Sequence, residues 1–165
     1  MASDSKTQTT IRVPILVWSA LVVNLERSGQ GRRESGAFVL GSRKNGSSKA
    51  TSYLCYDDLD PASLTGGVDF HASGYAALWA HCRKHQLEVL FDVHTHPGAD
   101  VRQSEIDRTH PMIPQVDHLA VILPRFGKCS RWSLNEAGIY AYQGSFRWQT
   151  LGPGKNQCCI RLSLW

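Results

Sequence analysis

The sequence predicts an α/β domain of mixed α and β structure, in which a central mixed β-sheet is flanked by helices. A length of 165 residues fits one domain, and 42% apolar with 19% charged residues is the composition of an ordinary globular protein. The apolar residues recur with a helical period in some segments and form short strand-like runs in others. Disordered, collagen-like and coiled-coil classes are therefore disfavoured.

The N-terminal part is predicted to be a tail followed by a buried helix. Residues 1–10 are polar and aperiodic, which leaves 11–165 as the domain. Val13–Val23 is almost continuously apolar and predicts a helix that begins at Pro14, where a missing N–H costs nothing, and ends near Gly29. Basic residues precede this run, as in a signal peptide, but no small-residue cleavage motif follows it. Because the run is also short of the roughly 20 residues of a membrane span, secretion and membrane anchoring are disfavoured.

The middle of the chain combines strands with one amphipathic helix. Glu34–Gly41 is a short apolar run with glycines near its ends and predicts a central strand. Residues 42–67 contain many Gly and Ser residues and are expected to form a loop-rich excursion around one strand at Thr51–Tyr56. From Asp69 the pattern is helical. Four apolar residues at i, i+3, i+4 and i+7 would face the sheet: Tyr75, Leu78, Trp79 and Cys82.

The C-terminal half is predicted to consist mainly of strands. Glu88–Val93 returns to a strand pattern, and a short helix is expected near Ser104. Leu119–Leu123 is a continuous apolar run that predicts a buried strand. Gly138–Tyr142 and Phe146–Thr150 flank a Gln-Gly pair and predict a terminal hairpin.

Two histidines at the end of a predicted strand are candidate metal ligands. His94 and His96 are two residues apart, and alternate side chains along a strand point the same way, so both imidazoles can reach one ion. Asp107 follows across a loop long enough to bring its carboxylate back to the pair. Three such ligands with an open fourth position are typical of catalytic zinc. Glu34, at the start of another strand, is the candidate base for the attacking water.

Three short motifs contain these residues: Glu34-Ser-Gly-Ala-Phe-Val-Leu-Gly41, His94-x-His96-Pro97 and Ser104-x-x-Asp107. Taken together, they resemble the zinc-binding motif of the JAB/MPN (JAMM) metalloproteases. The order of the predicted elements over about residues 11–150 is also similar to that family. The resemblance implies a cytidine-deaminase-like JAB/MPN fold.

The resemblance also implies a role for each matching residue. His94, His96 and Asp107 would hold one catalytic Zn²⁺. Glu34 would accept the proton of the attacking water and return it to the leaving amine. The hydroxyl of Ser104 would donate a hydrogen bond to the tetrahedral oxyanion.

The substrates and partners of the chain follow from the same resemblance. The family implies a peptidase or isopeptidase, similar to a deubiquitinase, that cleaves after the C-terminal tail of ubiquitin or a ubiquitin-like protein. Compact bacterial members occur beside E1-like and E2-like enzymes in operons linked to antiphage defence. The expected reaction is deconjugation of a ubiquitin-like protein from its targets, or maturation of its precursor.

Simpler interpretations of these residues stay open at this stage. Ser104 and Asp107 have the spacing of a capping box at a helix start. Glu34 could neutralise Arg32 and Arg33, although a surface pair of that kind contributes only about 0–1 kcal/mol. The whole chain could also be a catalytically silent MPN-type scaffold, which is disfavoured because such members usually lack the ligands.

The net charge of +4 lies in one stretch. Residues 31–49 contain five basic residues and one acid, and the rest of the chain is balanced. Arg43, Lys44 and Lys49 are therefore candidates for steering an acidic substrate. Nucleic acid is disfavoured as a partner because aromatic residues are not interleaved with these charges, and a nucleic-acid-associated protein would show salt-dependent binding.

The remaining histidines and the cysteines are predicted to have no role in the chemistry. His81 and His85 are spaced as in helical zinc sites, but no glutamate lies between them, so they are expected on a helix surface. His110 and His118 have no partner at informative spacing. The odd number of cysteines predicts reduced thiols and a cytoplasmic protein. These are Cys55, Cys82, Cys129, Cys158 and Cys159.

Overall fold

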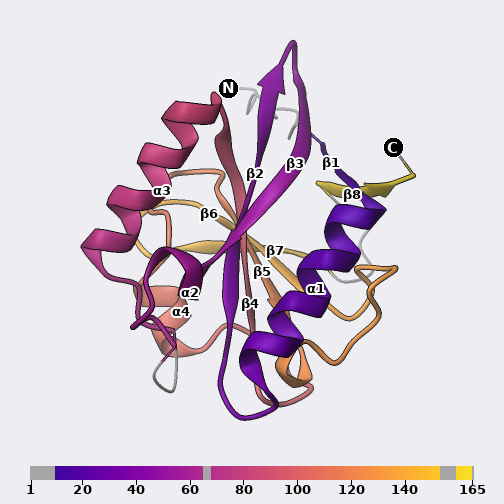
Figure 1. Cartoon of the computed structure of the whole chain (residues 1–165). Helices are drawn as coiled ribbons and strands as arrows, with labels where there is room; N and C mark the ends of the chain where they lie inside the picture. The colour runs from indigo at the N-terminus through magenta and orange to yellow at the C-terminus, as the bar shows by residue number, and fades with distance from the viewer. Residues whose placement is uncertain (1–9, 65–67, 153–158, 165) are drawn as a thin grey trace.

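The computed structural model describes residues 10–64, 68–152 and 159–164, so the expected N-terminal tail lies almost entirely outside the described residues. Within them, eight strands form one twisted sheet in the order β7-β6-β5-β4-β2-β3-β1-β8 (Figure 1). The strands are β1 (Ile11–Pro14), β2 (Gly36–Lys44), β3 (Ser47–Cys55), β4 (Glu88–Thr95), β5 (Leu119–Leu123), β6 (Gly138–Tyr142), β7 (Trp148–Gly152) and β8 (Ile160–Ser163). The helices are α1 (Ile15–Gly29), α2 (Tyr56–Leu59), α3 (Ala72–His85) and α4 (Glu105–Thr109), with a 3-10 turn, η1, at Arg125–Gly127.

The predicted mixed α/β class is confirmed. β4 pairs in parallel with β5, whereas β2 is antiparallel to both of its neighbours, β3 and β4. The strands that the sequence did not indicate, β1 and β8, pair in parallel with each other at one edge of the sheet. Each has four residues, too few for a clear alternation of apolar and polar side chains, and β1 continues directly into the apolar run of α1.

Helix α1 covers one face of the sheet and agrees with the predicted helix to within one residue. Its side chains Trp18, Leu21 and Leu25 are fully buried and pack in one cluster with Val39 of β2 and Val93 of β4. Full burial of each such side chain contributes about 1.5–3 kcal/mol. Helix α1 has 15 residues, fewer than the roughly 20 that span a bilayer. No helix among the described residues is both long and apolar enough to cross a membrane.

Helices α2 and α3 cover the opposite face (Figure 1). A second apolar cluster joins Phe38 of β2 to Tyr56 of α2 and Leu78 of α3. The expected stripe on α3 is only partly correct, because Leu78 and Cys82 are buried but Trp79 is 39% exposed. Instead of joining the core, Trp79 lines a surface groove beside α3.

The expected loop-rich excursion over residues 42–67 is wrong for its first half. Strand β2 continues to Lys44 and β3 begins at Ser47, so the two strands form one long hairpin. Asn45 and Gly46 connect them with φ values of 49° and 74°, the left-handed geometry of a tight hairpin turn. The Asn-Gly pair is the strongest short-range hairpin signal, and it could have indicated this turn from sequence.

Candidate metal centre

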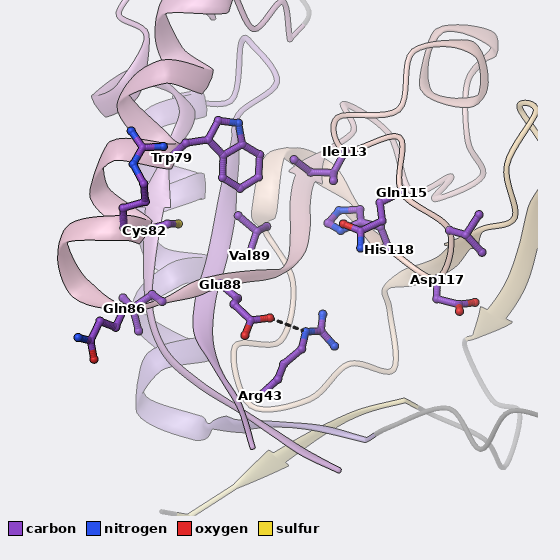
Figure 2. A pocket seen from close by; sticks show the side chains of 13 residues that line it. Arg43, Trp79, Cys82, Gln86, Glu88, Val89, Ile113, Gln115, Asp117 and His118 are labelled. Atoms are coloured by element: carbon purple, nitrogen blue, oxygen red, sulfur yellow. Dashed lines mark ion pairs between the residues drawn. The ribbon is translucent and has the colours of Figure 1, made fainter. Parts of the chain in front are cut away.

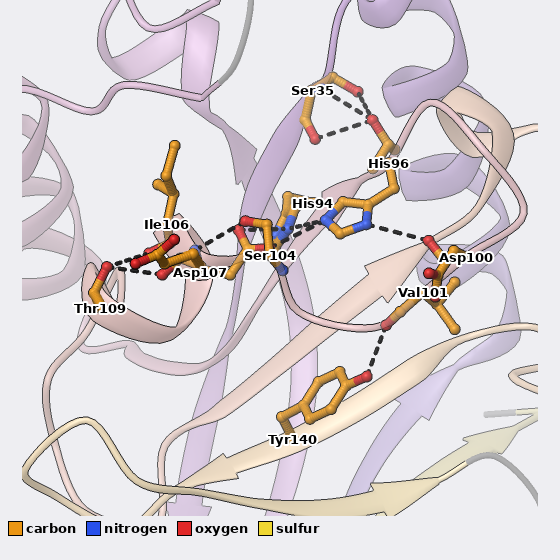
Figure 3. Close-up of polar contacts among 12 residues, drawn as sticks. Ser35, His94, His96, Asp100, Val101, Ser104, Ile106, Asp107, Thr109 and Tyr140 are labelled. Carbon is orange, nitrogen blue, oxygen red and sulfur yellow. Dashed lines mark hydrogen bonds and ion pairs between the residues drawn. The ribbon is translucent and has the colours of Figure 1, made fainter.

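The C-terminal end of β4 presents both histidines on the α3 face of the sheet. Gly36 of β2 lies opposite His94 and Phe38 lies opposite Asp92, so these four residues share that face. His96 follows β4 by one residue and continues the same alternation. The Nε2 atoms of His94 and His96 lie 3.2 Å apart, and both side chains are largely buried (Figure 3).

Helix α4 brings Asp107 to the two imidazoles. Its Oδ1 lies 3.2 Å from Nε2 of His94, and its Oδ2 lies 3.2 Å from Nε2 of His96. Helix α4 begins with a capping box in which the backbone N–H of Asp107 donates to Oγ of Ser104 at 3.1 Å. In return the N–H of Ser104 donates to Oδ2 of Asp107 at 2.7 Å. The capping and ligand interpretations of Asp107 are therefore compatible, because one carboxylate serves both.

The spacing of the three side chains fits a small metal ion. Ligand atoms about 2.0–2.1 Å from a tetrahedral ion lie roughly 3.3 Å from one another. The nitrogen and oxygen atoms of His94, His96 and Asp107 are separated by 3.2 Å, and all lie within 4.8 Å of one another. A search of the described residues for three or more His, Cys, Asp or Glu side chains that could hold a metal gives this group: His94, His96 and Asp107. The donor set, two imidazoles and a carboxylate, suits a divalent transition metal.

Hydrogen bonds behind the ligands orient them. Nδ1–H of His96 donates to the carbonyl of Asp100 at 3.2 Å, which leaves its Nε2 lone pair free for a metal (Figure 3). The backbone N–H of Phe126 donates to the carbonyl of His96 at 2.8 Å, and that of Arg125 donates to the carbonyl of Gly98 at 2.8 Å. The loop after His96 is therefore fixed to turn η1.

Glu34 lies beside the three ligands. The ladder between β2 and β4 continues one step beyond β2, because the N–H of Thr95 donates to the carbonyl of Ser35 at 2.9 Å. Glu34 therefore lies opposite His96 and on the same face. Burial raises the pKa of Glu34, and the charge of Asp107 acts in the same direction, although the two histidines oppose it. A carboxylate with a raised pKa is suited to general base chemistry.

The basic residues next to Glu34 do not pair with it. The guanidinium of Arg33 donates to the carbonyls of Ser28 and Leu64, and that of Arg32 donates to Oε1 of Gln30. In the described part of the chain, Glu34 makes neither an ion pair nor a hydrogen bond. Its carboxylate is thus half-buried and available, which the surface-pairing interpretation does not explain.

The comparisons with known proteins establish the fold. No family model matches the sequence. The structure is similar to the solution structure of a protein from Desulfitobacterium hafniense, with a TM-score of 0.62 and 14% sequence identity, covering 93% of both chains. It is also similar to the solution structure of a protein from Salinibacter ruber, with a TM-score of 0.60 and 17% identity, covering 88% of this chain and 93% of that one. At these identities the similarity concerns the fold alone.

The three basic residues predicted to steer the substrate are not close to the ligands. Arg43, Lys44 and Lys49 lie near the turn of the β2–β3 hairpin and are exposed. Gly36 marks the metal end of β2, and Arg43 is seven residues further along, about 23 Å at 3.3 Å per residue. These residues would therefore act on a substrate over a distance or at a remote part of its surface.

A groove of about 730 Å³ lies beside that hairpin (Figure 2). It runs between α3 and the segment 113–118, and Trp79 forms part of its wall. Nε of Arg43 pairs with Glu88 at 3.3 Å at its edge, which places one of the three basic side chains there.

One of the other histidines, His118, forms a buried pair that its spacing in the sequence did not indicate. Its Nε2 lies 2.7 Å from Oδ1 of Asp92. The two residues are 26 positions apart and meet only because β4 and β5 are neighbours. His81 and His85 lie on the surface of α3, as predicted, with His85 exposed, His81 partly exposed and their ring centroids 4.4 Å apart.

The cysteines are in accord with the expected reduced thiols where the structure describes them. Cys55, Cys82 and Cys129 form no disulfide. Burial raises the pKa of Cys55 to about 12 and that of Cys129 to about 11, so neither is a reactive thiolate near neutral pH. Cys158 lies outside the described residues.

The affinity for the metal is expected to fall as the pH decreases. The fall should begin at a higher pH than the ordinary pKa of histidine would give. Burial lowers the pKa of His96, but the hydrogen bond and charge of Asp107, followed by the charge of Glu34, outweigh it and raise this pKa above 6.5. Because a proton on the imidazole excludes the metal, affinity is retained above the raised pKa and falls about tenfold per pH unit below it. Competition titration of Zn²⁺ between about pH 8.5 and 5.5 measures this.

The control for this titration is Glu34→Gln, which keeps the three ligands and removes one charge that raises the pKa of His96. The midpoint of the affinity loss should shift to lower pH in this variant. An affinity independent of pH over the whole range would contradict protonation of His96 as the competing event.

Proposed function

We propose that the chain is a zinc-dependent peptidase of the JAB/MPN (JAMM) type with a cytidine-deaminase-like fold. The observation that carries the proposal is the convergence of His94, His96 and Asp107 within 4.8 Å of one another beside Glu34. The motif resemblance supports the same assignment. A site with three protein ligands and room for a fourth is the arrangement of catalytic rather than structural zinc.

Each residue has a role in the proposed hydrolysis. Bound zinc would polarise the scissile carbonyl and make the attacking water acidic enough to ionise near neutral pH. The carboxylate of Glu34 accepts the proton of that water and transfers it to the leaving amine. The hydroxyl of Ser104 accepts from the backbone within its capping box, and its own hydrogen is left to donate to the developing oxyanion.

The proposed substrate is the bond that follows the C-terminal tail of a ubiquitin-like protein, in a conjugate or in a precursor. The partners are then that ubiquitin-like protein, its conjugates, and E1-like and E2-like enzymes of a bacterial antiphage pathway. The proposed compartment is the cytoplasm, where the thiols of Cys55, Cys82 and Cys129 would stay reduced.

A catalytically silent MPN-type scaffold is less well supported. Such a scaffold has no need of three ligands at 3.2 Å spacing, two of which, His96 and Asp107, have a supporting hydrogen bond or capping interaction. It also has no need of a half-buried glutamate held without a partner beside them, since burial of such a carboxylate costs folding free energy.

The proposed function is tested by incubating the protein with linear fusions and isopeptide conjugates of candidate ubiquitin-like proteins. Cleavage after the tail is expected, with loss of activity in a chelator and recovery when Zn²⁺ is added back. Tight binding of zinc without cleavage of any fusion or conjugate would favour the scaffold. A salt-dependent affinity for nucleic acid would instead indicate a nucleic-acid-associated protein.

Removing the basic charges of the β2–β3 hairpin is expected to weaken substrate capture without affecting zinc. A small protein domain is about 30 Å across, so a substrate whose tail reaches the ligands can also reach this hairpin. The triple variant Arg43→Gln, Lys44→Gln and Lys49→Gln should raise KM at low salt, and the effect should decrease as salt screens the charges. The Arg43–Glu88 pair is exposed, so stability should change little.

This prediction is checked by measuring KM across a salt series together with zinc stoichiometry. An unchanged KM at low salt would remove the hairpin from substrate capture. The matched control removes the same net charge from exposed positions that do not line the groove beside the hairpin: Arg27→Gln, Arg131→Gln and Arg147→Gln.

A further inference from the structure

Tyr56 is fully buried, yet its hydroxyl makes no hydrogen bond of good geometry in the described part of the chain, although the carboxylate of Asp92 lies close enough to interact with it. Its ring is one of the largest in the apolar cluster between the sheet and α3 and packs against Phe38, with ring centroids 4.9 Å apart. Packing alone would be served equally well by phenylalanine, because a buried hydroxyl without a partner destabilises a fold. The hydroxyl of Tyr56 therefore calls for another explanation.

The position of this ring is tied to the metal centre through Gly36. A Cβ atom at position 36 would lie 2.1 Å from Cε2 and 2.8 Å from Cζ of Tyr56, so the ring occupies the space that a side chain there would fill. Gly36 is paired with His94, and Cβ atoms of such cross-strand pairs lie about 4.5–5.5 Å apart on the same face. The ring of Tyr56 thus lies over Gly36, directly across the β2–β4 pairing from His94 and on the same face of the sheet.

The residue that interacts with the hydroxyl, Asp92, belongs to a buried pair with His118. Asp92 precedes His94 by two residues and points to the same face, and its Oδ1 is 2.7 Å from Nε2 of His118. Both side chains are at least 96% buried. Burial and then the charge of Asp92 raise the pKa of Tyr56 well above its ordinary value, so its hydroxyl keeps its proton and can donate it to a hydrogen bond.

His94 has one ring nitrogen still to be accounted for. Its Nε2 faces His96 and Asp107, and no hydrogen bond of its Nδ1 is found among the described residues. A histidine that binds a metal through Nε2 carries its hydrogen on Nδ1 and almost always donates it to an acceptor. His96 has such an acceptor in the carbonyl of Asp100, whereas His94 lacks one.

We propose that Tyr56 is a positioning residue for the metal centre, with its hydroxyl accepting from Nδ1–H of His94 and donating to the carboxylate of Asp92 when the metal is bound. Nε2–H of His118 donates to the same carboxylate, so every hydrogen in the series from His94 to His118 has an acceptor. This inference rests on the metal site of the proposed function. It adds a hydrogen-bond acceptor for Nδ1–H of one ligand, His94.

The test compares Tyr56→Phe with Tyr75→Phe, whose hydroxyl belongs to the same aromatic cluster but donates to the carbonyl of Met112 at 2.6 Å. Tyr56→Phe is expected to leave the melting temperature of the metal-free protein unchanged or higher, and to weaken Zn²⁺ binding about 10–100-fold. Its Co²⁺-loaded form should have a visible spectrum different from the wild type. Tyr75→Phe should lower the melting temperature and leave both metal properties unchanged.

Zinc affinity and a cobalt spectrum within error of wild type in Tyr56→Phe would overturn the inference, as would an equal loss of affinity in both variants. The measurements need no peptidase substrate, so they are separable from the proposed function. Wild-type protein that binds zinc, loses affinity in Tyr56→Phe and cleaves no conjugate would support this inference while contradicting the peptidase.

Discussion

Glu34→Gln is expected to lower kcat by about 10²–10⁴-fold while zinc stays bound at one ion per chain. Glutamine has nearly the shape of glutamate but cannot accept the proton of the attacking water. The three ligands are untouched, and Glu34 makes no hydrogen bond or ion pair within the described residues that the substitution would break. The measurements are kcat on a linear fusion of a ubiquitin-like protein and zinc content by elemental analysis.

The matched control is Glu26→Gln, which removes an exposed acid from the neighbouring helix α1 and should leave kcat unchanged. If Glu34→Gln cleaved the fusion at the wild-type rate, the assignment of Glu34 as the base would be wrong. If it lost zinc as well as activity, Glu34 would be acting as a ligand instead.

His96→Ala is expected to weaken zinc binding by more than about 100-fold, beyond the loss typical of residues that only support a ligand. The substitution removes one of the two nitrogen ligands, and Asp107 also loses the imidazole that lies 3.2 Å from its Oδ2. Loss of the metal removes hydrolysis with it. Zinc affinity is measured by competition with a chromogenic chelator, and folding by circular dichroism.

His85→Ala is the control, because His85 is an exposed histidine of α3 outside the metal centre and its removal should change neither zinc affinity nor activity. Stoichiometric, tight zinc in His96→Ala would mean that the metal lies elsewhere. A folded His96→Ala protein without zinc would instead support the centre described above.

The elements with strong local patterns were predicted well from sequence. Helix α1 and strand β5 agree with expectation to within one residue, because an apolar run next to proline or glycine has few alternatives. The terminal hairpin was also predicted, although β7 begins at Trp148 rather than Phe146. Strands β1 and β8 were missed because each is stabilised by a partner that is distant along the chain, as in the pairing of Ile11 with Ile160.

In the candidate site, too, local features could be predicted from sequence, whereas pairings between distant segments could not. His94 and His96 could be placed together because two-residue spacing on one strand is a local property. Asp107 could be placed at the start of a short helix from sequence, because that helix begins with a recognisable capping box at Ser104. The partner of His118 could not be predicted, because Asp92 is 26 residues earlier and joins it only through the pairing of β4 with β5.

Neighbouring residues alone thus specify strand β4, the two-residue spacing of its histidines and the capped helix that carries Asp107. The reason is that periodicity and capping depend only on residues close together in the chain. Placement of Glu34 opposite His96, of Tyr56 over Gly36 and of Arg43 far from the ligands depends on the folded sheet. Strand order and register are selected by burial of apolar faces from segments far apart in the chain, and no local pattern contains that information.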